Sequence, residues 1–229
     1  MDGKKIKQVL LLVCLALIVS ANQAYAKCND RRAPGVDWSG CKKTNKMLDG
    51  SNFTGGRFDN ANLAASSLDK GDFTDASLVK TDLTRGSAKG ARFYNSDLTK
   101  FGGYRAHFER ASLQNSILTK SEFVRANFNN AEILDVDWSK SELGRANFSG
   151  ALLENVSFEY SNISRVRFDK ATLTGVDFWR AYTYRTHFEN VDLRQVRRLS
   201  QLQLEIACGN ENTQIPQGRW IPDSWPCSE

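Results

Sequence analysis

A large apolar residue recurs at every fifth position through most of this chain of 229 residues. The series runs from Trp38 to Leu193, over 32 in-frame positions without an insertion or deletion. Other residues stand at four of these centre positions: Lys43, Ala88, Gly103 and Thr183. A step of five turns a side chain by about 140° on an α-helix, and on a straight strand it alternates between the two faces. The period therefore predicts a chain that bends at regular corners and points every centre inward.

The residues before each centre are also characteristic. Two positions earlier the residue is small, and one position earlier it is often Asp or Asn, as in Ala61-Asn62-Leu63, Thr81-Asp82-Leu83 and Ala146-Asn147-Phe148. This pattern resembles the A-(D/N)-L-x-x motif of the pentapeptide repeat family over about residues 36–195. The resemblance implies an all-β fold, a right-handed quadrilateral β-helix with four pentapeptides per coil. The solenoid would have about eight coils, and because a coil cannot bury its apolar residues alone, both ends need caps.

The first 26 residues have the layout of a secretory signal peptide. Lys4, Lys5 and Lys7 precede an apolar run at residues 9–20, and Ala24-Tyr25-Ala26 matches a cleavage site. The apolar run is shorter than the roughly 20 residues that span a bilayer. We therefore expect a periplasmic or secreted protein, cleaved near Ala26, with no membrane span in its mature form.

Four cysteines remain after cleavage, and an exported chain with an even number of cysteines is expected to form disulfides. Cys28 and Cys41 lie in an N-terminal cap at residues 27–41, and Cys208 and Cys227 in a C-terminal cap at residues 196–229. Three pairings are possible. Eight stacked coils would separate the caps by about 38 Å, and bridged cysteines need Cα atoms within about 7 Å of each other, so we expect one disulfide at each end.

A short helix is expected in the C-terminal cap. Ser200 and Gln203 have the spacing of a capping box, and Gly209 is a typical helix stop. These signals predict a helix at residues 201–208. It would lay Leu202, Leu204 or Ile206 over the last coil.

Residues twenty apart share a column if four units make one coil. One core column is expected to form a stack of five phenylalanines: Phe108, Phe128, Phe148, Phe168 and Phe188. At the centre Gly103, where a large side chain is missing, we expect Phe101 to fill the space. Tyr104 and Tyr184 each precede an arginine on one face, and Trp179 and Tyr182 lie near the C-terminal end. Such exposed rings can mark a binding surface, but we expect them to cover the junction with the C-terminal cap.

Basic residues gather on two neighbouring corners, two positions after the centres of two core columns. The first set, the arginine column, is Arg85, Arg105, Arg125, Arg145, Arg165 and Arg185. The second set, the lysine column, is Lys80, Lys100, Lys120, Lys140 and Arg180, with Tyr160 between the last two. The equivalent positions of the other two corners hold mostly Gly, Asn and Asp. Arginines stacked one coil apart repel one another.

Two interpretations of these columns remain open. An acid stands three residues before many of the cations, as in Asp82–Arg85 and Asp137–Lys140, so the columns can form a solvated ladder of ion pairs. Alternatively, they form a stripe that binds an extended polyanion, such as a surface polysaccharide, lipopolysaccharide phosphates or nucleic acid.

The sequence disfavours catalysis. His107 and His187 fall in one column four coils apart, about 19 Å, so they cannot share a metal or a substrate. We expect no catalytic residue, metal or cofactor, and the partner's identity stays unknown: an envelope polymer, another protein or, through a terminal cap, a second copy. Some family members are DNA mimics that bind topoisomerases, but export and the mature net charge of +3 (28 basic and 25 acidic residues) disfavour that alternative. We expect an exported, non-enzymatic scaffold or binding protein.

Overall fold

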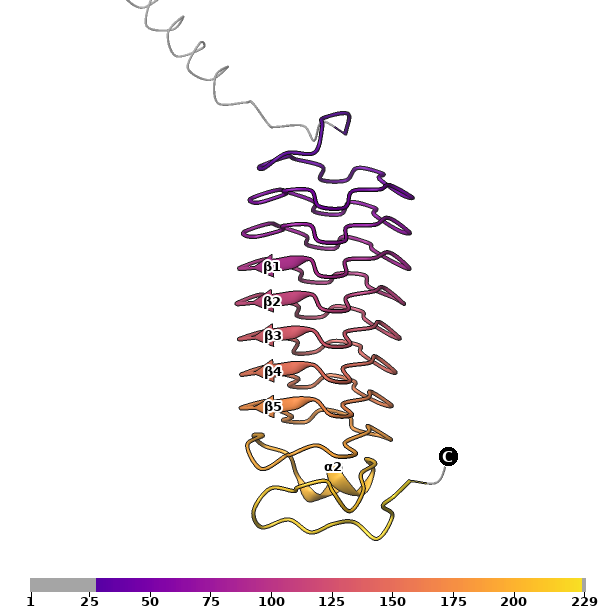
Figure 1. The fold of residues 1–229 in the computed structure, drawn as a ribbon, viewed down its shortest axis with the longest axis vertical. Helices are drawn as coiled ribbons and strands as arrows, with labels where there is room; N and C mark the ends of the chain where they lie inside the picture. Colours follow the sequence, from indigo (N-terminus) through magenta and orange to yellow (C-terminus); the bar gives the residue numbers. More distant parts are fainter. Residues whose placement is uncertain (1–27, 228–229) are drawn as a thin grey trace, which may run out of the picture.

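The computed structural model describes residues 28–227, and these residues form a long rod of stacked coils with a compact cap at its C-terminal end (Figure 1). The predicted signal peptide and its cleavage site lie outside the described residues.

The rod is an all-β parallel solenoid. Its regular strands, β1 (Arg92–Tyr94), β2 (Ser112–Gln114), β3 (Glu132–Leu134), β4 (Leu152–Glu154) and β5 (Thr172–Thr174), form one sheet in sequence order. Each strand pairs with the next in parallel, residue i with residue i+20. Isolated parallel bridges keep the same register from Asp37↔Arg57 to Asp177↔Arg197. The predicted twenty-residue coil is therefore confirmed.

The Asp or Asn before each centre stabilises the turn that follows it. The Oδ1 atom of Asp82 accepts a hydrogen bond from the backbone N–H of Thr84 at 2.8 Å, and Oδ1 of Asn147 accepts one from Ser149 at 2.9 Å. Short polar side chains favour such contacts with the backbone two residues on. The third residue of the turn, two positions after the centre, has a positive φ on nearly every corner.

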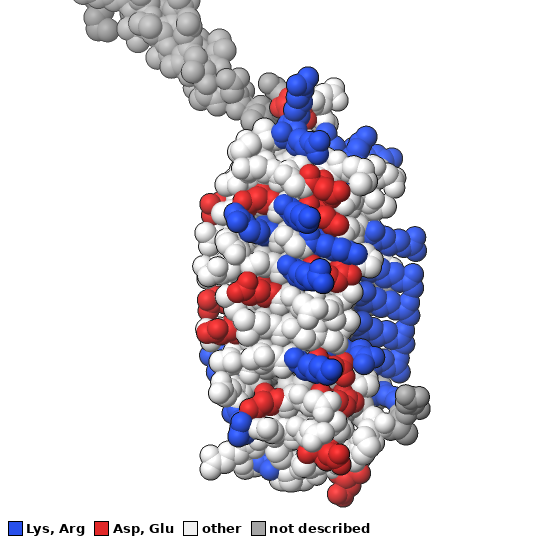
Figure 2. All heavy atoms as spheres, in the orientation of Figure 1, with Lys and Arg blue, Asp and Glu red and all other residues white. Residues whose placement is uncertain are grey.

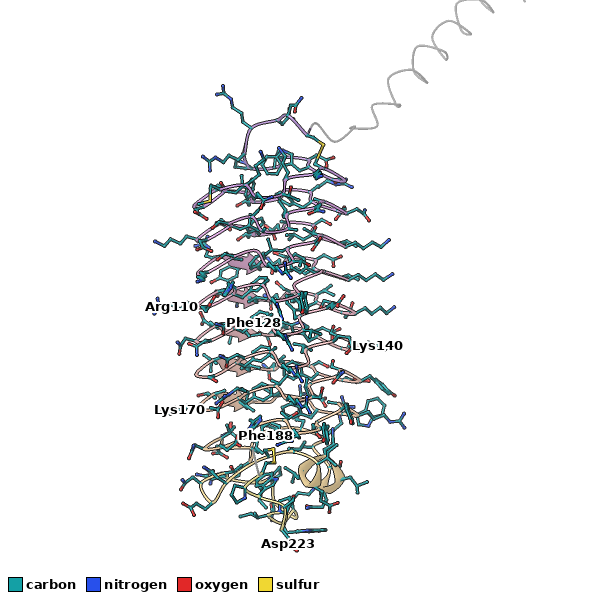
Figure 3. All side chains as sticks on the ribbon, turned by 90° about the vertical axis from the view of Figure 1, so that its right-hand side faces the viewer. Arg110, Phe128, Lys140, Lys170, Phe188 and Asp223 are labelled. Carbon is teal, nitrogen blue, oxygen red and sulfur yellow. A yellow bond between two sulfur atoms is a disulfide. The ribbon has the colours of Figure 1, made fainter. Side chains whose placement is uncertain are left out.

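The centres fill the interior, where the predicted phenylalanine stack is confirmed. The rings of Phe108 and Phe128 have centroids 5.0 Å apart, those of Phe128 and Phe148 4.8 Å, those of Phe148 and Phe168 5.4 Å, and those of Phe168 and Phe188 5.6 Å. All four pairs are parallel to within 19°. The stack lies on the inside of the coils, where Figure 3 labels Phe128 and Phe188. Such ring pairs add about 0.5–1.5 kcal/mol each beyond their burial.

The small residues beside the core are of two kinds. Alanines bury a methyl group, and serines donate a hydrogen bond to a backbone carbonyl of the neighbouring coil. Ser116 and Ser161 are 1% exposed, and their hydroxyls donate to the carbonyls of Phe93 and Trp138 on the preceding coil at 2.5 and 2.6 Å. A buried hydroxyl is tolerated because it is hydrogen-bonded.

The space at Gly103 is filled differently from the prediction. A Cβ atom on Gly103 would lie 2.4 Å from the ring of Phe123, so Phe123 takes that space. Phe101 is buried and stacks on Phe123, with centroids 5.6 Å apart. A centre on the next coil therefore leans over the glycine, and Phe101 supports it.

Both expected disulfides are present. Cys28 pairs with Cys41 and Cys208 with Cys227, with Cα atoms 5.4 and 5.3 Å apart. In the C-terminal cap the indole N–H of Trp225 donates to the carbonyl of Ala207 at 2.8 Å, which ties the last residues to the end of the solenoid.

The cap helix α2 (Gln201–Glu205) is shorter than predicted. Ser200 and Gln203 form the expected capping box, but the helix ends with Ile206 as its C-cap, ahead of Gly209. The prediction to residue 208 is wrong because Cys208 pairs in parallel with His187 and so extends the solenoid. Of the apolar residues of the helix, only Leu204 is buried, whereas Leu202 is 73% exposed. Within residues 28–227 no helix has the length and apolar character to cross a membrane.

Candidate functional site

The arginine column is set by the backbone of successive coils. The N–H of Arg105 donates to the carbonyl of Val124 at 3.0 Å, that of Arg125 to Gly144 at 3.0 Å, and that of Arg145 to Ser164 at 2.8 Å. Each arginine is thus fixed one coil above the next, about 4.8 Å apart. All members of the column are exposed except the half-buried Arg185. Figure 2 shows Lys and Arg side chains gathered in a line along one long edge of the rod.

Both columns occupy neighbouring corners of the coil. Figure 3 labels Lys140 on one side of the rod, and Arg110 and Lys170 on the opposite side. Lys140 belongs to the lysine column, and the other two belong to the corner two units further along the chain. The arginine column follows the lysine column by five residues, so the basic stripe covers two adjacent corners of one rod.

The ion-pair ladder that the sequence left open does not form among residues 28–227. No carboxylate oxygen there lies within 4.0 Å of Lys80, Lys100, Lys120, Lys140 or Arg180, nor of the arginine column from Arg85 to Arg165. The acids are engaged elsewhere. Oδ1 of Asp137 accepts from the backbone N–H of Ser139 at 2.9 Å, and Oε2 of Glu142 accepts from the amide of Asn162 at 2.9 Å.

Ion pairs form instead between side chains outside the two columns. Arg92 lies 2.7 Å from Asp72, and Arg167 lies 2.9 Å from Asp169. Burial acts to raise the pKa of Asp72, but hydrogen bonds from Thr74 and the charge of Arg92 outweigh it, so this pKa is lowered. The chain therefore pairs many of its other charges and leaves the columns solvated.

The backbone conformation of the columns is unfavourable for long side chains. The arginines have φ between 52° and 63°, in the left-handed region. Gly, Asn and Asp adopt this region readily, whereas for other L-residues it costs about 1–2 kcal/mol. One of the other two corners, which we call the fourth corner, follows the arginine column by ten residues. Its equivalent position holds only Gly, Asn or Asp over seven successive coils: Gly55, Asp75, Asn95, Asn115, Asp135, Asn155 and Gly175. The requirements of the turn therefore do not account for arginine.

The lysine column ends at an aromatic cluster. The guanidinium carbon of Arg180 lies 5.0 Å from the ring centroid of Trp179 and 5.5 Å from that of Tyr160. Arg198 covers Trp179 at 4.9 Å and pairs with the buried Asp177. Hydrogen bonds and the charge of Asp177 raise the pKa of Arg198. Trp179 thus contacts Arg198, which directly follows the bridge Asp177↔Arg197 at the start of the expected cap.

Tyr182 does not cover the junction as expected. It is 53% exposed and stacks on Tyr184, with centroids 6.2 Å apart and an interplanar angle of 13°. The pair lies on the arginine side of the rod, and the guanidinium carbon of Arg165 lies 5.9 Å from the ring of Tyr184.

A groove lies on this side, and sequence reasoning missed it. Its volume is about 560 Å³, and Tyr104, Tyr184 and the arginines Arg125, Arg145 and Arg165 are among its lining residues. The column position directly after the centre holds Tyr104, then Val124, Gly144 and Ser164, then Tyr184. Three smaller residues between two tyrosines make the hollow. Reading this column in steps of twenty would have found it.

The two histidines lie outside this groove. Nδ1 of His107 lies 2.9 Å from Oε1 of Glu109, and His187 makes the same contact with Glu189. Burial acts to raise the pKa of Glu109, but the hydrogen bond and charge of His107 and the charge of Lys89 outweigh it and lower this pKa. Within residues 28–227 no group of three or more His, Cys, Asp and Glu side chains is placed to hold a metal ion.

These observations define a parallel β-solenoid of five-residue units with a basic stripe. Two family profiles match: "Pentapeptide repeat region" over residues 104–168 and "Pentapeptide repeats (8 copies)" over residues 48–85. The chain belongs to the pentapeptide repeat protein family. Proteins of this family are generally non-enzymatic binding proteins.

One solved structure supports the fold. QnrB1, a plasmid-mediated fluoroquinolone resistance protein, aligns with a TM-score of 0.56 and 15% identity, over 77% of this chain and 90% of QnrB1. HetL of the cyanobacterium Nostoc sp. strain PCC 7120, a pentapeptide repeat protein involved in heterocyst differentiation regulation, aligns with a TM-score of 0.41 and 19% identity, over 85% and 93% of the two chains. No curated protein sequence matches significantly. At these identities the similarity concerns the fold alone.

Proposed function

We propose that this protein is exported, is not an enzyme, and binds an extended polyanion of the cell envelope along its arginine and lysine columns. The scaffold is the right-handed, four-sided rod of about eight coils implied by the family resemblance, closed by a disulfide-linked cap at each end. The N-terminal sequence supports export, and cleavage near Ala26 would give a periplasmic or secreted chain.

The arginine column carries the proposal. Arg85, Arg105, Arg125, Arg145 and Arg165 occupy successive left-handed corner positions, without a carboxylate within reach among residues 28–227. Neither ion pairing nor turn conformation favours arginine here. A bound anion supplies the missing partner, because guanidinium groups pair with carboxylate or phosphate in a two-pronged geometry.

Charge alignment also suits a polymer better than a small ligand. Cations spaced about 4.8 Å apart contact successive charges of one extended chain. Binding to such a chain releases its condensed counterions, so the affinity is expected to fall steeply with salt. A line of one sign of charge also raises the association rate.

The proposal is tested with inorganic polyphosphate, a polyanion without rings, and the mature oxidised protein at low salt. The triple variant Arg105→Glu, Arg125→Glu, Arg145→Glu is expected to lose at least about tenfold in affinity. The matched control is Lys70→Glu, Arg110→Glu, Lys170→Glu, since these cations also have positive φ but lie on another corner. Both variants change the net charge equally. Equal losses in the two variants, or no binding by the wild type, would contradict a column site.

Export has its own measurement. The intact mass of the protein recovered from the periplasm or culture medium is expected to match a chain that begins at Lys27, with both disulfides formed. Recovery of the full-length chain only from the cytoplasm would contradict export.

The DNA-mimic alternative gains no support from the similarity to QnrB1, which concerns the fold. A DNA mimic presents acidic groups in place of phosphates, whereas one long edge of this rod is lined by Lys and Arg (Figure 2). The polyanion proposal is therefore preferred.

A further inference from the structure

The groove on the arginine side combines charge with aromatic surface, which simple polyanion binding does not need. Tyr104 and Tyr184 stand at its two ends, and Arg125, Arg145 and Arg165 line it between them. We propose that this groove is a subsite for an acidic polysaccharide, holding a short run of sugar units, one per coil, with their acid groups on the arginines. This inference rests on the proposed function and specifies its ligand class.

The tyrosines offer apolar faces beside cations. Tyr184 is 41% exposed, the ring of Tyr182 lies nearly parallel to it with centroids 6.2 Å apart, and the guanidinium carbon of Arg165 lies 5.9 Å from its ring centroid. Arg105 holds Tyr104 in the same way at 5.2 Å. A sugar ring has the complementary surface, since its C–H face packs on an aromatic ring while its hydroxyl and acid groups stay at the edge.

A glycine in the groove has no structural explanation. A Cβ atom on Gly144 would meet Ser164 Oγ at 3.5 Å, an ordinary contact, and Gly144 does not have a positive φ. By contrast, a Cβ on Gly86 would lie 2.4 Å from Leu83. The fold therefore requires glycine at 86 and not at 144, and at 144 the small residue lines the hollow together with Val124 and Ser164.

The spacing of the column favours a polysaccharide over duplex nucleic acid. The rungs repeat at about 4.8 Å, which is close to the advance of one extended pyranose unit. A nucleic acid strand stacked in a duplex advances about 3.4 Å per phosphate and falls out of register within a few rungs. The expected export also brings the chain to the compartment where acidic polysaccharides occur.

The test uses trigalacturonate and longer oligogalacturonates as probes, with inorganic polyphosphate as a ringless polyanion and oligothymidylate as a single-stranded nucleic acid. Two groove variants are measured in the mature oxidised protein. The first is Gly144→Leu, whose side chain is designed to fill the hollow. The second is the double variant Tyr104→Ala, Tyr184→Ala. Thr84→Leu is the matched control for the first, because Thr84 lies in the same column one coil before Tyr104 and outside the lining residues. Tyr94→Ala, on another side of the rod, is the control for the second.

Each groove variant is expected to weaken oligogalacturonate binding at least about tenfold and to change polyphosphate binding less than about twofold. The two controls are expected to bind both probes like the wild type. Failure of the wild type to bind polyphosphate would refute the proposed function itself. Polyphosphate binding with oligogalacturonate affinity unchanged by Gly144→Leu would overturn the subsite alone. Tighter oligothymidylate binding, abolished by Gly144→Leu, would also overturn it in favour of a nucleic acid.

Discussion

Replacing one arginine of the column with asparagine is expected to stabilise the protein. Arg125 has a φ of 60°, is exposed, and makes no ion pair or side-chain hydrogen bond with residues 28–227. Asparagine, which the fourth corner uses at the same position, adopts a positive φ with little strain. Removing a native side chain usually destabilises a protein by about 1 kcal/mol, so the expected sign is the opposite of the usual one.

The magnitude has two parts. Relief of the left-handed conformation contributes about 1 kcal/mol. Arg105 and Arg145 stand one coil away on either side, and two unit charges about 5 Å apart in water repel by about 0.8 kcal/mol at low salt. Because the guanidinium groups can splay, we take about 1 kcal/mol for both neighbours together. Arg125→Asn is therefore expected to raise the free energy of unfolding by about 2 kcal/mol at low salt.

Urea unfolding with intact disulfides measures both parts. Arg110→Asn is the control, because Arg110 has a φ of 58° but is flanked in its column by Gly90 and Asn130, so only the conformational part applies. At low salt Arg125→Asn is expected to stabilise more than Arg110→Asn does. In 1 M salt, where the screening length is about 3 Å, the two variants are expected to converge near 1 kcal/mol.

A loss of stability in Arg125→Asn at low salt would refute this reasoning. It would mean that the arginines make a net stabilising interaction with the rod, and the column would then need no ligand to account for it. A gain in stability accompanied by loss of polyanion binding would mean that the wild type keeps a less stable residue at this position because binding requires it.

Other expected outcomes follow from the core, the caps and the ion pairs. Phe128→Ala, in the middle of the ring stack, is expected to lower the free energy of unfolding by about 3–5 kcal/mol, measured in urea. Cys208→Ser with Cys227→Ser, which opens a link between residues 19 apart, is expected to lower it by about 3 kcal/mol, and an unchanged midpoint would contradict a stabilising role for the cap disulfide. Because the folded-state pKa of Asp72 is lowered, its contribution to stability is expected to be complete above the ordinary aspartate pKa and to be lost as the pH falls through the lowered value. Arg92→Gln is expected to raise that pKa in an NMR titration, and no change would contradict the ion pair.

Much of the fold could be predicted because five-residue periodicity leaves few alternatives. The twenty-residue register, the ring stack from Phe108 to Phe188 and the pairing of cysteines at each end all follow once the coil length is known. The helix end was mispredicted because Gly209 is a strong local signal, whereas the strand pairing of Cys208 depends on a coil about twenty residues earlier.

The candidate site was only partly predictable. The arginine column is visible in the sequence. Whether the carboxylate of Asp82 forms an ion pair with Arg85 or accepts a hydrogen bond from the backbone N–H of Thr84 depends on the direction of its side chain. The motif aspartate has a backbone N–H two residues on within reach, and this local bond removes it from the ion-pair ladder. The groove was missed because it is made by small residues, Gly144 and Ser164, which carry no chemical signal by themselves.

The salt dependence of polyphosphate binding tests the central claim most directly. The wild type is compared with Arg105→Asn, Arg125→Asn, Arg145→Asn, a variant expected to fold at least as stably. The logarithm of the binding constant falls linearly with the logarithm of the salt concentration. If the column contacts the polymer, removing three cations makes this line less steep, by about 2 in the magnitude of its slope. An unchanged slope and affinity in this variant would contradict the claim that the arginine column is the binding site.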